Sequence, residues 1–118
     1  MLPQQHRVRK GNELRNVMRS GTRKGCRNVV VFATPTKNPV PRFGFIVSRK
    51  VGNAAVRNLV KRRLRASAWE IIKEGIPNHD VVVRGLPAAA HADYNTLNTD
   101  LRNGLRRIGV DISGTQQK

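Results

Sequence analysis

The chain has 118 residues, a length typical of one domain, and its 23 Lys and Arg against 7 Asp and Glu give a net charge of +16. A single cysteine excludes an intrachain disulfide, and no apolar run approaches the roughly 20 residues that cross a bilayer. Because the first residues also lack the apolar core of a signal peptide, we expect a cytoplasmic protein.

The first half of the chain predicts one helix and two strands. Gly11-Asn12 is a plausible cap for a short helix over about 13–20, which Gly21 ends, and its apolar stripe is Leu14, Val17 and Met18. Residues 28–34 predict a strand because four successive members are β-branched or aromatic. A loop with three prolines leads to a second strand at 42–48, whose alternation places Phe43, Phe45 and Val47 on one face.

The second half predicts a long helix, a third strand and a last helix. Asn53 is a natural N-cap for a helix over 54–74, and Gly75 ends it. A strand at 80–84 and a loop at 85–91 precede a helix over 94–108 with Leu97, Leu101, Leu105 and Ile108 on one face. We expect residues 1–112 to form one RNA-binding domain and 113–118 a disordered tail. This order predicts an α+β fold with one small sheet.

The strongest functional signal is a basic face on the helix at 54–74. Residues 14–69 contain fourteen Lys or Arg and no acid. Within the helix Arg57, Lys61 and Arg65 recur every four residues, Asn58 and Arg62 share their side, and the apolar stripe lies opposite. Arg63 falls off this face. Like charges at this spacing repel by a few tenths of a kcal/mol per pair, which a phosphate backbone would offset by neutralisation.

The turn before this helix adds two cations, Arg49 and Lys50, beside a glycine and exposed helix amides, which favours an anion site. Side chains for catalysis are missing from the pattern. His6, His79 and His91 are far apart, and the seven acids do not form the close set that a two-metal nuclease needs. We therefore predict that the protein binds RNA and breaks no bond with its own side chains.

Two other classes of protein remain as alternatives. A ribosomal or RNA-chaperone protein would carry the same basic face without any enzymatic role. A membrane-active cationic protein would need bulky aromatics beside the basic face, and the helix offers only Trp69.

Two adjacent motifs stand out in the middle of the chain. Residues 45–54 read Phe-Ile-Val-Ser-Arg-Lys-Val-Gly-Asn-Ala, and residues 57–65 form a basic signature, Arg-Asn-x-x-Lys-Arg-x-x-Arg. Together they closely resemble the protein subunit of bacterial ribonuclease P, and the resemblance covers nearly the whole chain. It implies the order α-β-β-β-α-β-α, with an extra short strand at about 21–26. It also implies a four-stranded sheet packed with three helices and a left-handed βαβ crossover, the ribosomal-protein-S5-like second-domain type.

The resemblance further implies a function and two RNA-binding surfaces. Family members join a catalytic RNA that removes the 5′ leader of precursor tRNA, with Mg²⁺ held mainly by the RNA and none bound tightly by the protein. They need no further protein partner and no membrane. The catalytic RNA would contact Arg49, Lys50, Arg57, Asn58, Lys61, Arg62 and Arg65, and the leader would enter a cleft at Leu14, Met18 and Phe32.

The sequence departs from the family pattern in two places. Leu59 stands where the basic signature usually has arginine, and the cleft positions of the first helix, often aromatic, are Leu14 and Met18. Aromatic faces stack best on bases, at roughly 1–3 kcal/mol per base. The leader would therefore depend more on Phe32 and on charge, and the alternative that Leu14 and Met18 are core residues stays open.

Overall fold

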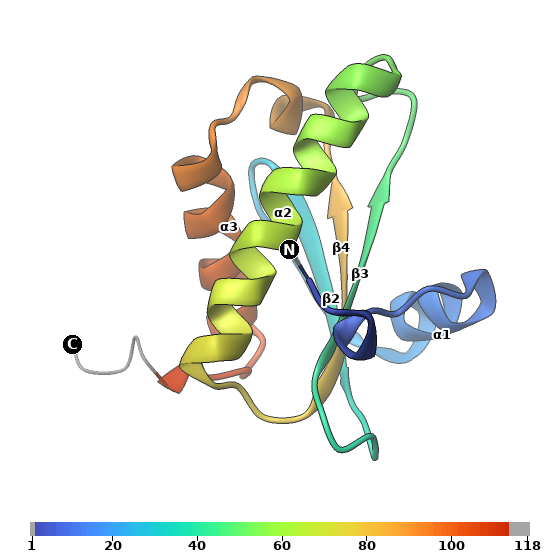
Figure 1. The fold of residues 1–118 in the computed structure, drawn as a ribbon, viewed down its shortest axis with the longest axis vertical. Helices are drawn as coiled ribbons and strands as arrows, with labels where there is room; N and C mark the ends of the chain where they lie inside the picture. Colours follow the sequence, from blue (N-terminus) through green and yellow to red (C-terminus); the bar gives the residue numbers. More distant parts are fainter. Residues whose placement is uncertain (1, 114–118) are drawn as a thin grey trace.

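The computed structural model describes residues 2–113 and contains three helices and four strands (Figure 1). In chain order they are α1 (Gly11–Ser20), β1 (Thr22–Gly25), β2 (Val29–Pro35), β3 (Arg42–Val47), α2 (Ala54–Glu74), β4 (His79–Gly85) and α3 (Tyr94–Arg107). Two short 3-10 turns, η1 (Gln4–His6) and η2 (Pro87–His91), lie before α1 and before α3. The predicted α+β class and element order, including the extra short strand, are confirmed.

The strands form one mixed sheet in the order β1-β2-β4-β3. β2 pairs antiparallel with β1 and β4, whereas β3 and β4 run parallel. In Figure 1 the chain ascends β3, descends α2 in front of the sheet and ascends β4 to the left of β3. That path is a left-handed crossover, as the resemblance implied, and it goes against the strong right-handed preference of such units.

The sheet buries both faces, but with different partners. Alternate residues of β2 and β4, such as Val31 and Val83, join α2 and α3 in the larger core, and Phe43 and Val47 of β3 join them. On the opposite face Val30, Phe32 and Val82 form a smaller cluster with Val17 of α1. The predicted alternation of β3 is confirmed, because Ile46 packs on this second face.

Helix α2 has the predicted bounds because both ends carry the expected signals. The Asn53 side chain accepts a hydrogen bond from Val56 N at 3.0 Å, and Gly75 ends the helix at φ 106°, a conformation that favours glycine. Its inner stripe, Val60, Leu64, Ala68 and Ile71, is at most 1% exposed. The opposite side of α2 therefore has a fixed orientation toward solvent.

Several predicted boundaries differ from the structure. The strands predicted at 28–34, 42–48 and 80–84 lie at 29–35, 42–47 and 79–85, and further differences occur in the helices and loops. Helix α1 begins at Gly11, with Lys10 as an N-cap that makes no side-chain hydrogen bond, so the Gly11-Asn12 cap is wrong. The loop at 85–91 contains η2, which buries Ala89, and α3 ends one residue early. Most of the predicted tail lies outside the described residues; Ser113 donates its N–H to Gly75 O at 2.8 Å.

Residues 2–10, the N-terminal segment, pack along the outer edge of β3. Val8 N donates to Phe43 O at 2.9 Å, and Arg7 forms a parallel bridge with Phe43. Leu2, His6 and Val8 are at most 6% exposed, and the His6 ring lies 5.7 Å from that of Trp69 on α2. The segment thus joins β3 to α2.

Helices α2 and α3 are fastened to each other by an ion pair. Arg102 donates two hydrogen bonds to the carboxylate of Glu74, at 2.7 and 2.8 Å, and a third to Asn98. Asn98 also accepts from Ser67 of α2 at 2.6 Å. The two bonds from Arg102 lower the pKa of Glu74 below its ordinary value of 4.5.

We expect Glu74→Gln to lower the free energy of unfolding at pH 7 and to have a smaller effect at pH 3. A carboxyl whose folded pKa is depressed adds stability above its unfolded pKa, and that contribution is lost as pH falls through the folded value. Urea unfolding at both pH values measures it, with Glu70→Gln as control because the Glu70–Lys73 pair is about half exposed. Equal deficits at pH 7 and pH 3 would contradict this linkage.

Candidate RNA interface

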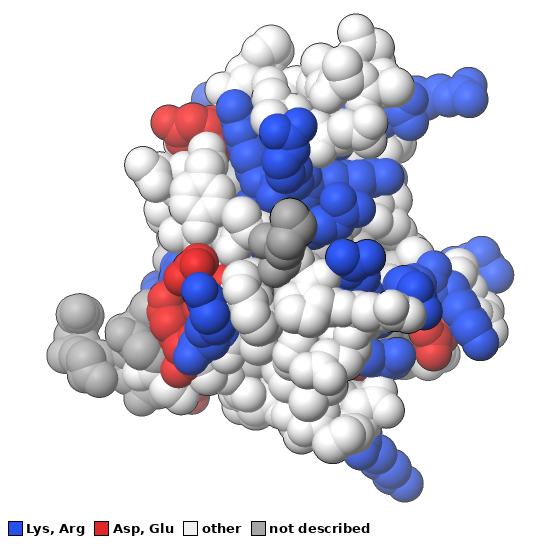
Figure 2. Space-filling model, viewed as in Figure 1, with Lys and Arg blue, Asp and Glu red and all other residues white. Residues whose placement is uncertain are grey.

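The predicted basic face of α2 lies on the surface, turned toward β3 and the N-terminal segment. Asn58 and Arg62 are exposed, whereas Arg57, Lys61 and Arg65 are half-buried. Lys61 and Arg65 lie beside the N-terminal segment. Figure 2 shows Lys and Arg side chains extending from the upper half of α2 across the view toward α1. The face is therefore wider than the helix that supplies its centre.

The acids of the chain do not neutralise this face. Among residues 2–113, no ion pair involves Arg57, Lys61, Arg62 or Arg65. Six of the seven acids are engaged elsewhere: Glu13 and Asp80 with Arg42, Glu70 with Lys73, Glu74 with Arg102, Asp93 with Thr96 N, and Asp100 with Asn28. The charge left on α2 is thus free for a polyanion.

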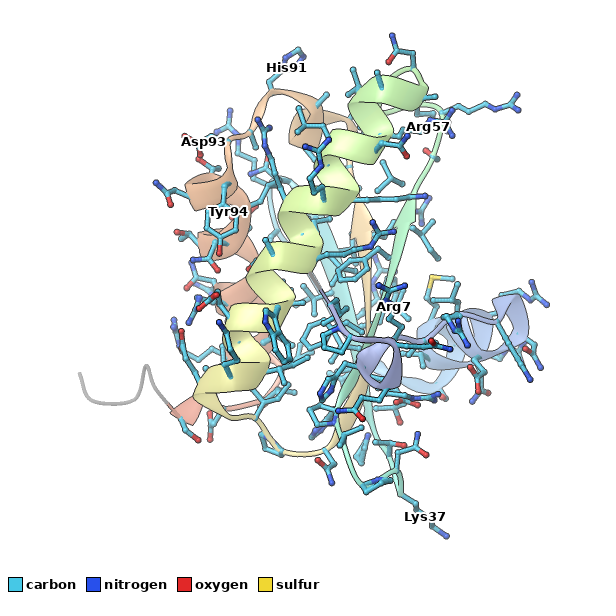
Figure 3. The ribbon with its side chains drawn as sticks, in the orientation of Figure 1. Arg7, Lys37, Arg57, His91, Asp93 and Tyr94 are labelled. Carbon is cyan, nitrogen blue, oxygen red and sulfur yellow. The ribbon has the colours of Figure 1, made fainter. Side chains whose placement is uncertain are left out.

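Arg57 is constrained more than the rest of the face. Its Nε is buried and has no hydrogen-bond partner in the described part of the chain. Figure 3 shows Arg57 near the start of α2, on the side toward β3. A buried donor without a partner costs roughly 1–3 kcal/mol, which offsets part of what the packing of this side chain contributes to stability.

Two further predictions about this region can be compared with the geometry. Arg63 donates to Ala92 O at 2.8 Å, so it binds the turn before α3 and lies off the basic face, as expected. Arg49 and Lys50 are exposed in the turn that Val51 N closes on Ser48 O. Because Val56 N already donates to the Asn53 side chain, only some of the amides at the helix N-terminus remain available to an anion.

The second face of the sheet holds the predicted leader-cleft residues. Leu14 and Met18 are partly buried against the small cluster around Val17, so each has both a packed and an accessible side. Phe32 is only 5% exposed, and the guanidinium carbon of Arg23 lies 5.5 Å from the centre of its ring. The accessible surface over this ring is therefore that of Arg23.

Sequence reasoning missed the cations of the N-terminal segment. Arg7 and Arg9 are exposed and, with Lys61 and Arg65 of α2, line a pocket of about 230 Å³. The available signal was the order His-Arg-Val-Arg at 6–9, in which two arginines alternate with His6 and Val8. Such a run is too short to predict a strand, and nothing in it indicates that it would lie beside α2.

Residues 2–113 contain neither a cluster of metal ligands nor a membrane-spanning helix. Nowhere in them do three His, Cys, Asp or Glu side chains gather closely enough to hold a metal ion. No helix in the same range has the length and apolar character needed to cross a membrane.

The fold and this surface define an α+β RNA-binding protein with a basic face formed by one helix and the segment beside it. The chain matches the family model for ribonuclease P over residues 2–109. It is 45% identical over 105 residues to the ribonuclease P protein component of Kocuria rhizophila, covering 89% of this chain and 93% of that one. The corresponding protein of a Nocardioides species is 42% identical, over 97% of this chain and all of its own.

Solved structures agree with the sequence matches. The ribonuclease P protein of Staphylococcus aureus superposes with a TM-score of 0.80 at 26% identity, over 89% of this chain and 96% of that one. The chain therefore belongs to the ribonuclease P protein family. As a member it is the non-catalytic protein part of a tRNA-processing endoribonuclease and acts with an RNA subunit, and the ribosomal or RNA-chaperone alternative is not favoured.

Proposed function

We propose that the basic face of α2 binds the RNA subunit and that the second face of the sheet receives the 5′ leader of precursor tRNA. The observation that carries the proposal is the unneutralised charge of α2, since six of the seven acids are engaged away from it. The contact residues would be Arg49, Lys50, Arg57, Asn58, Lys61, Arg62 and Arg65. Arginine forks suit bidentate phosphate contacts, which accounts for their excess over lysine.

The leader would pass over Leu14, Met18 and Phe32 on the second face of the sheet. Phe32 supports this path from beneath, because its ring is covered and Arg23 lies over it. A guanidinium plane can stack on a base as an aromatic ring does, so Arg23 provides the stacking surface that Leu14 and Met18 lack.

Hydrolysis itself would depend on Mg²⁺ held mainly by the RNA subunit. The described carboxylates do not converge as protein ligands for such an ion, and those engaged in ion pairs are already committed to arginine or lysine. The protein would act in the cytoplasm by supplying positive charge where RNA phosphates crowd, which lowers the Mg²⁺ needed to hold the complex together.

Reconstitution tests this function. The protein, its cognate RNA subunit and a precursor tRNA are combined at low Mg²⁺, and release of the 5′ leader is measured with and without the protein. We expect strong stimulation by the protein at low Mg²⁺ and a smaller effect at high Mg²⁺, where the metal substitutes for its charge. Cleavage that is equally slow with and without the protein would refute the proposal.

A further inference from the structure

A pocket of about 230 Å³ lies where the N-terminal segment meets α2 and β3. Four cations line it, Arg7 and Arg9 from the segment and Lys61 and Arg65 from α2, and its described lining contains no acid. Its remaining wall is mostly apolar and includes Phe43, Phe45 and Leu14. In Figure 3 Arg7 lies between α2 and α1, at the junction of the two predicted RNA surfaces.

The segment is held in place by its apolar side chains and its backbone. His6 and Val8 point inward and are 6% and 4% exposed, while Arg7 and Arg9 between and after them point outward. His6 Nδ1 donates to Pro41 O at 2.7 Å, and Val8 N donates to Phe43 O. Apart from the bond of Arg7 Nε to Leu2 O within the segment, these contacts use neither arginine, so the position of Arg7 and Arg9 beside α2 calls for another explanation.

The arrangement is unfavourable without an anion. Four positive groups around one small pocket repel each other, and no described acid lines it. Glu13 lies in a neighbouring pocket that Arg7 and Arg9 also line, where it pairs with Arg42. Arg7 uses its Nε on Leu2 O at 2.8 Å, which fixes the side chain and leaves its terminal nitrogens as donors. A phosphodiester carries one negative charge and several acceptor oxygens, so it would relieve the repulsion and use these donors.

We propose that Arg7, Arg9, Lys61 and Arg65 form one binding site for a phosphate of an RNA backbone. The site rests on the proposed function and extends it, because it makes the N-terminal segment a second RNA-binding element. The phosphate belongs either to the RNA subunit or to the precursor tRNA, since the pocket adjoins both predicted surfaces.

A double-mutant cycle tests the shared site. The cycle uses two double variants and the quadruple variant that combines them. The double variants are Arg7→Gln with Arg9→Gln and Lys61→Gln with Arg65→Gln. The control is the double variant Lys37→Gln with Arg106→Gln. The control pair is exposed, lies outside the pocket and removes the same charge as either pair; Figure 3 shows Lys37 far from Arg7. One arm measures affinity for the RNA subunit across salt concentrations, and the other measures affinity of the assembled enzyme for precursor tRNA.

We expect the Arg7/Arg9 double variant to weaken binding on the order of tenfold for whichever RNA, the RNA subunit or the precursor tRNA, contributes the phosphate. The slope of log affinity against log salt should fall by about 0.7–0.9, the value for one neutralised phosphate. The quadruple variant should lose less affinity than the product of the fold-losses of the two double variants, because both pairs of side chains act on one phosphate. Arg7→Lys with Arg9→Lys should retain the slope, and thermal unfolding of each variant checks that the segment stays docked.

Two results would overturn the shared site. In the first, the Arg7/Arg9 double variant has the same affinity and salt slope as the Lys37/Arg106 control in both arms. In the second, the quadruple variant loses the full product of the fold-losses of the two double variants. In either case a loss of RNA-subunit affinity in the Lys61/Arg65 pair would leave the proposed function standing. If that pair also matched the control, the basic face of α2 itself would be refuted.

Discussion

Replacing Arg57, Lys61 and Arg65 together by alanine is expected to weaken binding of the RNA subunit on the order of a hundredfold without weakening the fold. Three lost contacts to phosphate oxygens at roughly 1 kcal/mol each give that affinity change. Because we propose that Lys61 and Arg65 share one phosphate, two phosphates are affected and the salt slope should fall by about 1.4 to 1.8. The change removes the repulsion between Arg57 and Lys61 and between Lys61 and Arg65, a few tenths of a kcal/mol per pair. It also removes the unpartnered Nε of Arg57. Stability should therefore be unchanged or slightly raised.

Titration of the RNA subunit at several salt concentrations and urea unfolding of the free protein measure the two effects. The matched control removes three exposed cations away from α2, Lys37, Arg106 and Arg107. If the triple variant kept the wild-type salt slope, α2 would not be the interface. If it lost stability instead, these side chains would serve the fold rather than the RNA.

Phe32→Ala is expected to lower the free energy of unfolding by about 3–5 kcal/mol, the range for removing a buried aromatic ring. Phe32 is 5% exposed and packs with Val17, Val30 and Val82 beneath α1. The ring therefore contributes mainly to folding stability, and any loss of leader binding in the variant would follow from weaker packing of α1. For a domain of marginal stability the change is severe.

Urea unfolding measures this cost, and Arg23→Gln serves as the comparison. Removing the cation over the ring should cost only about 0.5–1 kcal/mol, yet it should weaken leader binding more than Lys37→Gln does. A Phe32→Ala protein of wild-type stability that no longer bound the leader would show that the ring itself contacts RNA.

The parts of the fold that sequence predicts are those whose signals are local. Asn53 and Gly75 define α2 because a cap and a left-handed glycine act within one turn of the chain. The alternation of β3 predicts its two faces for the same reason. The basic face is also visible in the sequence, because helical spacing alone brings Arg57, Lys61 and Arg65 together.

Features that depend on distant packing could not be predicted from residue patterns. The strand β1, Thr-Arg-Lys-Gly, has no apolar alternation and came only from the family resemblance. The start of α1 is not fixed by a cap, since Lys10 offers none, so packing of Val17 against the sheet must hold the helix. Whether Leu14 and Met18 were core residues depended on the opposite face, and the structure shows both side chains partly buried against the small cluster.

Both edges of the sheet are protected against a further strand. On one side β1 is four residues long and carries Arg23 and Lys24, a short charged edge that disfavours pairing. On the other side the N-terminal segment occupies the backbone of β3 at Phe43. These two edges therefore disfavour ordered aggregation of the free protein, and two residues at them, Arg7 and Arg23, are among those that we propose bind RNA.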